Sequence, residues 1–219
     1  MCPNGNADLT RSLILNSAIQ IISKDGLSAL TAGRLIEQAD ISKGGLYHHF
    51  RTMKEVEAEV LERLLHNLSL QISAYSKPES KSDFLDLIEK ELFECFIVGT
   101  DSSRALFAFL SEAVNNNTVQ VMLRRMMDDI SLQRLQQLMA VSTGVTHATL
   151  HNTVQIISTM QMGLMTRYFI AEDITSLKNY WKGCRGVLEE LLGMTEQVVL
   201  EDNVAEFPIS SERANLSRL

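Results

Sequence analysis

Proline is confined to three positions of the chain, Pro3, Pro78 and Pro208, and few segments alternate apolar and polar residues with period two. Proline interrupts helices and period-two alternation marks strands, so long stretches with neither favour helices. The 219 residues are 45% hydrophobic, which is enough for a sizeable core. The sequence therefore predicts an all-α protein of about nine helices.

Several classes of protein are disfavoured by the same sequence. The longest apolar-leaning run, residues 153–170, is interrupted by polar side chains and falls short of the roughly 20 apolar residues that a bilayer requires. The N-terminal stretch MCPNGNADLTR lacks the basic-then-apolar order of a signal peptide. Cys2, Cys95 and Cys184 are widely separated and suggest neither a disulfide framework nor a zinc ribbon. We expect a soluble cytoplasmic protein with no membrane contact.

Charge is distributed unevenly along the chain, whose formal net charge is −7. Residues 1–54 carry six Lys/Arg against four Asp/Glu, whereas residues 55–219 carry fourteen against twenty-three. A polyanion attracts basic surfaces and is repelled by acidic ones. Any contact with nucleic acid is therefore expected in the N-terminal quarter.

That quarter contains closely spaced helix signals. Apolar residues recur with helical spacing from Thr10 to Lys24, and Gly26 follows where a C-terminal glycine cap belongs. Thr31 stands as an N-cap for a short second helix, and Ser42 as the N-cap of a third that runs through Phe50.

A fourth helix is predicted from Thr52, which forms a capping box with Glu55, to about Tyr75. Two helices joined by a three-residue turn, with a helix before them, form a helix-turn-helix unit. We assign it to residues 8–54.

The third helix of this unit has two predicted faces. Leu46 and Phe50 are four positions apart and join a small core, which leaves Lys43, Gly44, Tyr47 and His48 pointing outward. The glycines at its first turn would let a partner approach the backbone closely. Taken alone, the stretch GGLYHHF is also compatible with an ordinary loop with solvated histidines.

The stretch from Arg11 to about Leu61 resembles the tetracycline-repressor (TetR) family of bacterial transcription regulators. The resemblance is carried by Arg11, Ile14, Leu15, Ala18, Gly26, Leu30, Thr31, Leu35, Ala39, Ile41 and the run SKGGLYHHF at residues 42–50. In that family the corresponding unit binds double-stranded operator DNA.

The resemblance implies a role for each residue of the motif. Lys43 and Gly44 would meet base edges in the major groove, and a lysine suits the acceptors of guanine. The residues implied to hold phosphates are Thr31, Ser42, Tyr47, His48 and His49. Three positions depart from the family pattern. Ile36 replaces the family's alanine inside the second helix. Asp40 replaces the usual turn glycine, and Met53 replaces the lysine that opens the fourth helix, with Lys54 one place later as the expected DNA contact.

Residues 55–193 are predicted to form an effector-binding and dimerisation domain. After a linker at residues 76–83, an amphipathic helix begins at Phe84, and two more are expected at residues 104–114 and 118–141. Their flexible apolar side chains suit an irregular ligand pocket for an apolar or amphipathic effector, although plain core filling explains them equally well. The residues predicted to bind that effector are Phe107, Leu110, Met122, Met126 and Met160.

Two last helices, at residues 147–170 and 175–192, are apolar over more than one face, which implies a partner surface. In the TetR family the corresponding pair forms a four-helix bundle with a second subunit, so the resemblance implies a homodimer. The predicted interface residues are Val154, Ile157, Leu164, Tyr168, Trp181 and Leu188. Residues 194–219 are polar and are predicted to form a C-terminal tail.

Two alternatives to a ligand-released repressor remain open. One is a regulator with the same DNA-binding unit that responds to a protein partner or to no ligand. The other is a helical metalloenzyme using His147 and His151, whose four-residue spacing on a helix is compatible with a metal. No third ligand lies near them in the sequence, and no catalytic motif is present, so we predict no enzyme activity, no catalytic residues, no cofactor and no metal.

Overall fold

The computed structural model describes residues 4–98 and 100–194. In these residues every regular element is a helix, which confirms the all-α prediction. The helices are α1 (Asn4–Asp25), α2 (Ala32–Ala39), α3 (Lys43–His49), α4 (Met53–Ser73), α5 (Lys81–Lys90), α6 (Thr100–Glu112), α7 (Asn117–Val141), α8 (His147–Ala171) and α9 (Ile174–Leu191). Two short elements complete them, the 3₁₀-helix η1 (Leu27–Ala29) and the π-helix η2 (Glu91–Val98). Apart from Met194, the predicted tail lies outside the described residues.

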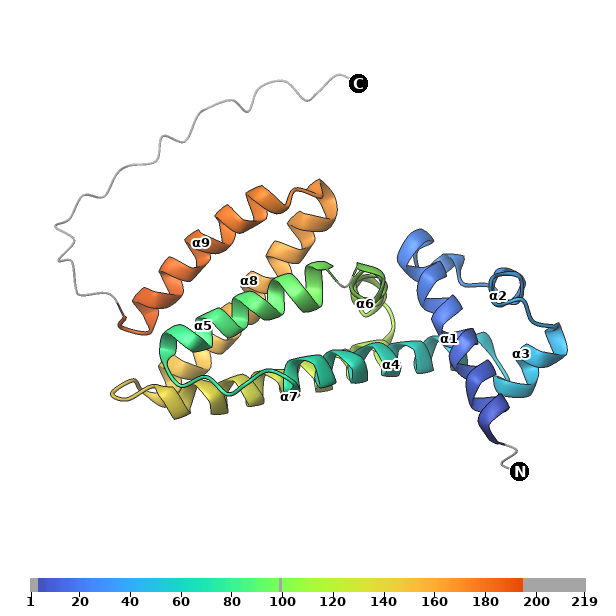
Figure 1. Cartoon of the computed structure of the whole chain (residues 1–219), viewed down its shortest axis with the longest axis horizontal. Helices are drawn as coiled ribbons and strands as arrows, with labels where there is room; N and C mark the ends of the chain where they lie inside the picture. The colour runs from blue at the N-terminus through green and yellow to red at the C-terminus, as the bar shows by residue number, and fades with distance from the viewer. Residues whose placement is uncertain (1–3, 99, 195–219) are drawn as a thin grey trace, which may run out of the picture.

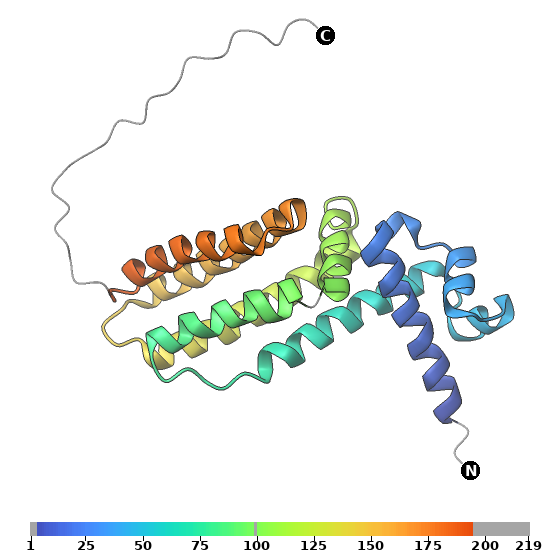
Figure 2. The same cartoon turned by 45° about the horizontal axis from the view of Figure 1, so that its top comes forward.

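The helices form two groups that share α4. Helices α1 to α3 lie together at one end of the molecule, and α5, α7, α8 and α9 form the larger group at the other (Figure 1). Helix α4 runs from the first group into the second and packs against both α1 and α7. Helix α6 lies across this arrangement, between α1 and the larger group (Figure 2), and packs closely on α1.

The predicted helix starts in the N-terminal group are confirmed by side-chain caps. The hydroxyl oxygens of Thr31 and Ser42 accept hydrogen bonds from the backbone N–H groups of Arg34 and Gly45, at 3.4 and 3.0 Å. Each bond satisfies one of the N–H groups that a helix start leaves without a partner.

The predicted capping box at the start of α4 is only half formed. Thr52 accepts from the Glu55 N–H at 3.2 Å. The Glu55 carboxylate, however, accepts from the backbone N–H of Arg51 at 2.7 Å rather than from Thr52. The carboxylate therefore satisfies the donor one residue earlier, in the turn between α3 and α4.

The turn between α2 and α3 depends on a left-handed residue. Asp40 has φ 49° and ψ 51°, and Gly26 in the preceding turn has φ 83°. Aspartate tolerates this conformation better than most residues because its short side chain bonds locally. Asp40 thus replaces the family's glycine without changing the three-residue turn that sets α3 against α2.

The linker predicted at residues 76–83 is shorter than expected. Ser80 is the N-cap of α5 and accepts from the Asp83 N–H at 3.0 Å, so the helix begins at Lys81. After Lys90 the chain continues as the π-helix η2. π-Helical turns are rare and are frequent at functional sites.

One continuous apolar core extends through both groups of helices. In the N-terminal group Ile14, Leu35, Leu46 and Phe50 are buried, as the sequence predicts. Burying side chains of this size stabilises the fold by about 1.5–3 kcal/mol each. These contacts hold α3 with one face inward and the other toward solvent.

Candidate nucleic-acid interface and interior pocket

The outward face of α3 consists of the residues that the sequence predicts. Lys43, Gly44, Tyr47 and His48 are exposed, whereas Leu46 between them is buried. His49 is half-buried, and its ring lies edge-on to that of His48 with 5.2 Å between centroids. A lysine ammonium, a phenol and imidazoles on one short helix supply several donors for phosphate or base acceptors.

The two glycines of α3 differ in their surroundings. A Cβ on Gly45 would lie 3.3 Å from the Ser42 Oγ that caps the helix, so this glycine makes room for the cap. A Cβ on Gly44 would meet only the same oxygen at 3.8 Å, an ordinary contact. Nothing in the described chain therefore requires a glycine at position 44, which is consistent with close approach by a partner from outside.

The other predicted phosphate contacts surround this face. Thr31, Ser42 and Lys54 are exposed at the starts of α2, α3 and α4. The oxygens of Thr31 and Ser42 accept the capping bonds, which leaves each hydroxyl hydrogen able to donate to an external acceptor. The N-termini of these helices also carry partial positive charge, which favours anions.

Arg11 positions α3 from behind. Its guanidinium donates to the carbonyl oxygen of His49 at 3.0 Å, lies 4.5 Å from the ring centre of Phe50 and forms a two-pronged ion pair with Glu59 on α4. Sequence reasoning noted Arg11 only as part of a motif and assigned it no role. The partner Glu59 is 48 residues away, and no local pattern marks it.

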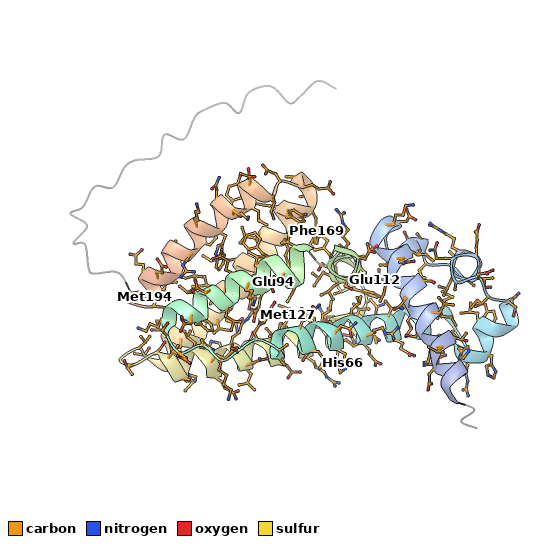
Figure 3. The ribbon with its side chains drawn as sticks, viewed as in Figure 1. His66, Glu94, Glu112, Met127, Phe169 and Met194 are labelled. Atoms are coloured by element: carbon orange, nitrogen blue, oxygen red, sulfur yellow. The ribbon has the colours of Figure 1, made fainter. Side chains whose placement is uncertain are left out.

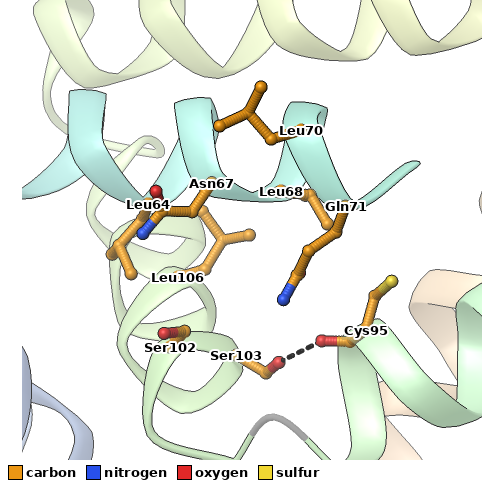
Figure 4. A pocket seen from close by; sticks show the side chains of 9 residues that line it. All are labelled: Leu64, Asn67, Leu68, Leu70, Gln71, Cys95, Ser102, Ser103 and Leu106. Carbon is orange, nitrogen blue, oxygen red and sulfur yellow. Dashed lines mark hydrogen bonds between the residues drawn. The ribbon is translucent and has the colours of Figure 1, made fainter. Parts of the chain in front are cut away.

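Two cavities, each partly open to solvent, lie between α4, α6 and their neighbouring helices. The first, of about 320 Å³, is lined by α4, η2 and α6, and its polar side includes Asn67, Gln71, Ser102 and Ser103 (Figure 4). The Ser103 hydroxyl donates to the carbonyl oxygen of Cys95 at 3.0 Å across this cavity's edge.

The second cavity, of about 80 Å³, lies between α4, α6, α7 and α8. Met127 at its rim, in the middle of the larger helical group, is labelled in Figure 3. The residues that line it are Leu68, Leu106, Leu110, Met126, Met127, Ile130, Arg134, Ser158, Gln161, Met162 and Met165. Leu68 and Leu106 also line the first cavity, so these two side chains form the wall between them.

The predicted effector residues are only partly brought together. Leu110 and Met126 line the second cavity, but Phe107, Met122 and Met160 are not among its lining residues. Phe107 instead packs edge-on against Phe169 of α8, with 5.3 Å between ring centroids. The other methionines that line this cavity are Met127, Met162 and Met165, and the set of effector-binding residues stays a prediction.

A buried ion pair, missed by sequence reasoning, adjoins the second cavity. Arg134 of α7 donates to Glu91 at the start of η2 at 2.7 Å, and the two side chains are 3% and 0% exposed. Burial raises the pKa of Glu91, although the Arg134 guanidinium acts in the opposite direction. The residues are 43 apart in sequence, so only the tertiary fold reveals the pair.

The dimer-interface prediction needs correction in its residues. The structure buries Val154, Ile157, Leu164, Trp181 and Leu188 in the core of the chain itself, and Tyr168 is half-buried. The five buried side chains pack α8 and α9 against their own neighbours and cannot form a surface between subunits, whereas Tyr168 keeps part of its surface exposed. Apolar residues that α8 and α9 do expose are Met162, Ile170, Ile174, Tyr180, Val187 and Leu191.

His147 and His151 are both exposed on the first turns of α8. Within residues 4–98 and 100–194, no three His, Cys, Asp or Glu side chains come together in a group that could hold a metal ion. None of the helices in the same ranges combines the length and apolarity needed to cross a membrane.

Comparison with known proteins relates the N-terminal unit to a described family. A family model described as "Bacterial regulatory proteins, tetR family" matches residues 14–60, from α1 into α4. Residues 14–60 therefore match the DNA-binding unit of this family. It is 22% identical over 192 residues to the HTH-type transcriptional regulator UidR of Escherichia coli (strain K12), an alignment that covers 85% of this chain and 94% of UidR. It is also 38% identical over 48 residues to the HTH-type transcriptional regulator QacR of Staphylococcus aureus (strain Mu50 / ATCC 700699), covering 22% and 26% of the two chains.

Solved structures share the fold of this protein. A TetR transcription regulator from Haloarcula marismortui matches with a TM-score of 0.70 and 17% identity, covering 86% of this chain and 98% of that one. The multidrug binding protein EbrR, complexed with malachite green, matches with a TM-score of 0.60 and 16% identity, over 83% and 96% of the two chains. The protein is a DNA-binding transcriptional regulator whose N-terminal helix-turn-helix unit matches the tetR family model.

Proposed function

We propose that the protein is a homodimeric repressor that binds double-stranded operator DNA through α3 and is released by an apolar or amphipathic small molecule. The observation that carries the DNA-binding part is the outward face of α3, where Lys43, Tyr47 and His48 surround a glycine that the fold itself does not require. In this reading Lys43 and Gly44 meet base edges, and the capping hydroxyls of Thr31 and Ser42 donate to phosphates.

Dimerisation is proposed through the outer face of α8 and α9. Tyr180, Val187 and Leu191 lie on one side of α9 at helical spacing, with exposed Gly183 between them. Small and apolar residues on one exposed helix face suit close packing against a second copy of the same pair. Two α3 helices would then have to lie about 34–36 Å apart to enter successive major grooves of DNA.

Effector control is proposed through α6. Leu106 and Leu110 of this helix line the second cavity, while the helix also packs on α1. Near its start Asp101 accepts a hydrogen bond of 2.9 Å from Ser23 of α1. A molecule that fills the cavity would displace α6, and α1 with it, which would change the spacing of the two α3 helices.

UidR is an HTH-type regulator, and EbrR was crystallised with malachite green. These likenesses support a DNA-binding regulator with an interior ligand site, and the proposed function requires no catalytic group.

The test begins with the full chain and fragmented genomic DNA. Retained fragments would be sequenced and bound again by wild type and by Lys43→Ala at matched salt. The proposal predicts one recurrent palindromic site that Lys43→Ala binds more weakly. Retention without sequence preference, or equal binding by the variant, would contradict the role given to α3.

A further inference from the structure

The second cavity is apolar except at one end. Of its lining residues only Arg134, Ser158 and Gln161 are polar, and they come from the facing helices α7 and α8. Arg134 donates to the Ser158 hydroxyl at 3.4 Å, and the Gln161 amide donates to the Ile88 carbonyl oxygen at 3.4 Å. The polar side chains are therefore held in place by the fold rather than mobile in the cavity.

The ion pair behind this polar end is incompletely satisfied. Glu91 Oε1 and Arg134 Nε are both buried and have no hydrogen-bond partner among the described residues. Such atoms are rare in folded proteins, because a buried polar atom that loses its water and gains no partner destabilises the folded state. Arg134, which lines the cavity, thus has one unmet donor. Glu91, its ion-pair partner, is not itself a lining residue and has one unmet acceptor.

The two unmet atoms define what a ligand must provide. Arg134 Nε–H needs an acceptor, and Glu91 Oε1 needs a donor. A hydroxyl or a primary amide carries both in one small neutral group. A carboxylate would compete with Glu91 for Arg134, and an ammonium group would face the Arg134 charge, so either would add an unpaired charge to an apolar surrounding.

We propose that the effector is an uncharged amphipathic molecule whose hydroxyl or amide group binds at Arg134 and Glu91 while its apolar body lies among the methionine side chains. This inference rests on the proposed function, since it names the chemistry of the same effector site. Leu68 and Leu106 line both this cavity and the larger one and lie between them. A change of rotamer at these two side chains would let the apolar part of a longer ligand extend into the larger cavity.

The test uses the full wild-type chain and four probes that share one alkyl chain: 1-octanol, octanamide, octanoate and octylamine. Binding of each is measured by isothermal titration calorimetry at pH 7. We expect 1-octanol and octanamide to bind at least about tenfold more tightly than the two charged probes, a difference of about 1.4 kcal/mol. Equal affinities, a preference for either charged probe, or no binding by any probe would overturn the proposal.

A double variant tests whether the preference arises at the ion pair. Glu91→Leu with Arg134→Met replaces both charges by apolar groups, an exchange that proteins often tolerate without loss of stability. The variant should bind 1-octanol and octanamide about tenfold less tightly than wild type does. Arg185→Met is the matched control, because Arg185 pairs at the surface with Asp86 and Glu189, away from both cavities.

The outcomes separate the two levels of inference. If the double variant still prefers the neutral probes, Arg134 and Glu91 do not have the proposed role. If the double variant does not fold, the order of probe affinities on the wild-type protein still decides the ligand chemistry. The same probes are then added to the protein bound to its operator. A preference that holds in wild type without DNA release supports the pocket chemistry and contradicts the proposed effector control.

Discussion

The guanidinium of Arg11 donates a hydrogen bond of 3.0 Å to the carbonyl oxygen of His49, which joins the first helix to the last residue of α3. A carbonyl at a helix end has no partner within the helix, so this bond satisfies an atom that would otherwise need water. The same side chain pairs with Glu59. One arginine therefore sets the distance and tilt between α1, α3 and α4.

Replacing Arg11 by methionine should loosen α3 while retaining most of the side-chain volume. We expect a loss of about 1.5–3 kcal/mol in unfolding free energy, typical of a hydrogen bond to a charged group, together with a fall in DNA affinity. Chemical denaturation and a DNA shift assay measure the two effects. Arg63→Met is the control, because Arg63 donates to the Ser12 carbonyl oxygen at 3.2 Å and so joins α1 to α4 without touching α3. If both variants bind DNA equally well, Arg11 does not position α3.

Lys43→Ala and Tyr47→Ala should each weaken operator binding by roughly 1–3 kcal/mol, the usual effect of losing one base or phosphate contact. Stability should be unchanged, because both side chains are exposed. Affinity is measured at several salt concentrations, with Lys178→Ala on the exposed side of α9 as the control. Wild-type affinity for both α3 variants would show that another surface reads the DNA.

Gly44→Ala separates folding from binding. Alanine is favoured over glycine within a helix by about 1 kcal/mol, and the added Cβ meets the Ser42 Oγ only at 3.8 Å, so the variant should be as stable as wild type or more so. Its DNA affinity should nevertheless fall, because the methyl group occupies the space of the approaching groove. Gly186→Ala on α9, where an added Cβ meets no described atom within 4 Å, should gain stability and keep full DNA affinity. Unimpaired DNA binding by Gly44→Ala would count against close approach at this position.

Two neighbouring residues of α9 test the proposed dimer face. Val187 is 47% exposed in the single chain and Leu188 is fully buried. Val187→Glu should yield a folded monomer with weak DNA binding, whereas Leu188→Glu should unfold the chain, since an unpaired carboxylate in a core costs several kcal/mol. Sedimentation and circular dichroism distinguish the two results. A Val187→Glu protein that stays dimeric would place the interface elsewhere.

Local sequence signals predicted the N-terminal unit well because its geometry depends on short-range interactions. The caps at Thr31 and Ser42 act over three residues, and the left-handed turn at Asp40 is a property of a single residue. The alternation of buried Leu46 with exposed Tyr47 follows from helical periodicity alone. The outward residues of α3 could therefore be named from the sequence.

The larger helical group was predicted less well because each of its helices is apolar on more than one side. Helical periodicity indicates that Val154 and Leu188 lie on apolar faces of their helices. It does not indicate whether those faces pack against the same chain or against a second subunit. The structure places both in the chain's own core and leaves Tyr180 and Val187 outside. Phe107 and Met160, which the sequence predicts to bind an effector, are not among the residues that line the second cavity.

By itself the sequence determined the all-α class, the helix-turn-helix unit and the residues that α3 presents, since these depend on contacts within a few positions of the chain. Only the tertiary structure decided which side chains line the cavities and which cover the outer face of α8 and α9. It alone brought Glu91 to Arg134 across 43 residues and Arg11 to His49 across 38. The physical reason is that such pairs are selected by how helices pack, and packing depends on the shape of every neighbour at once rather than on the spacing of residues along one helix.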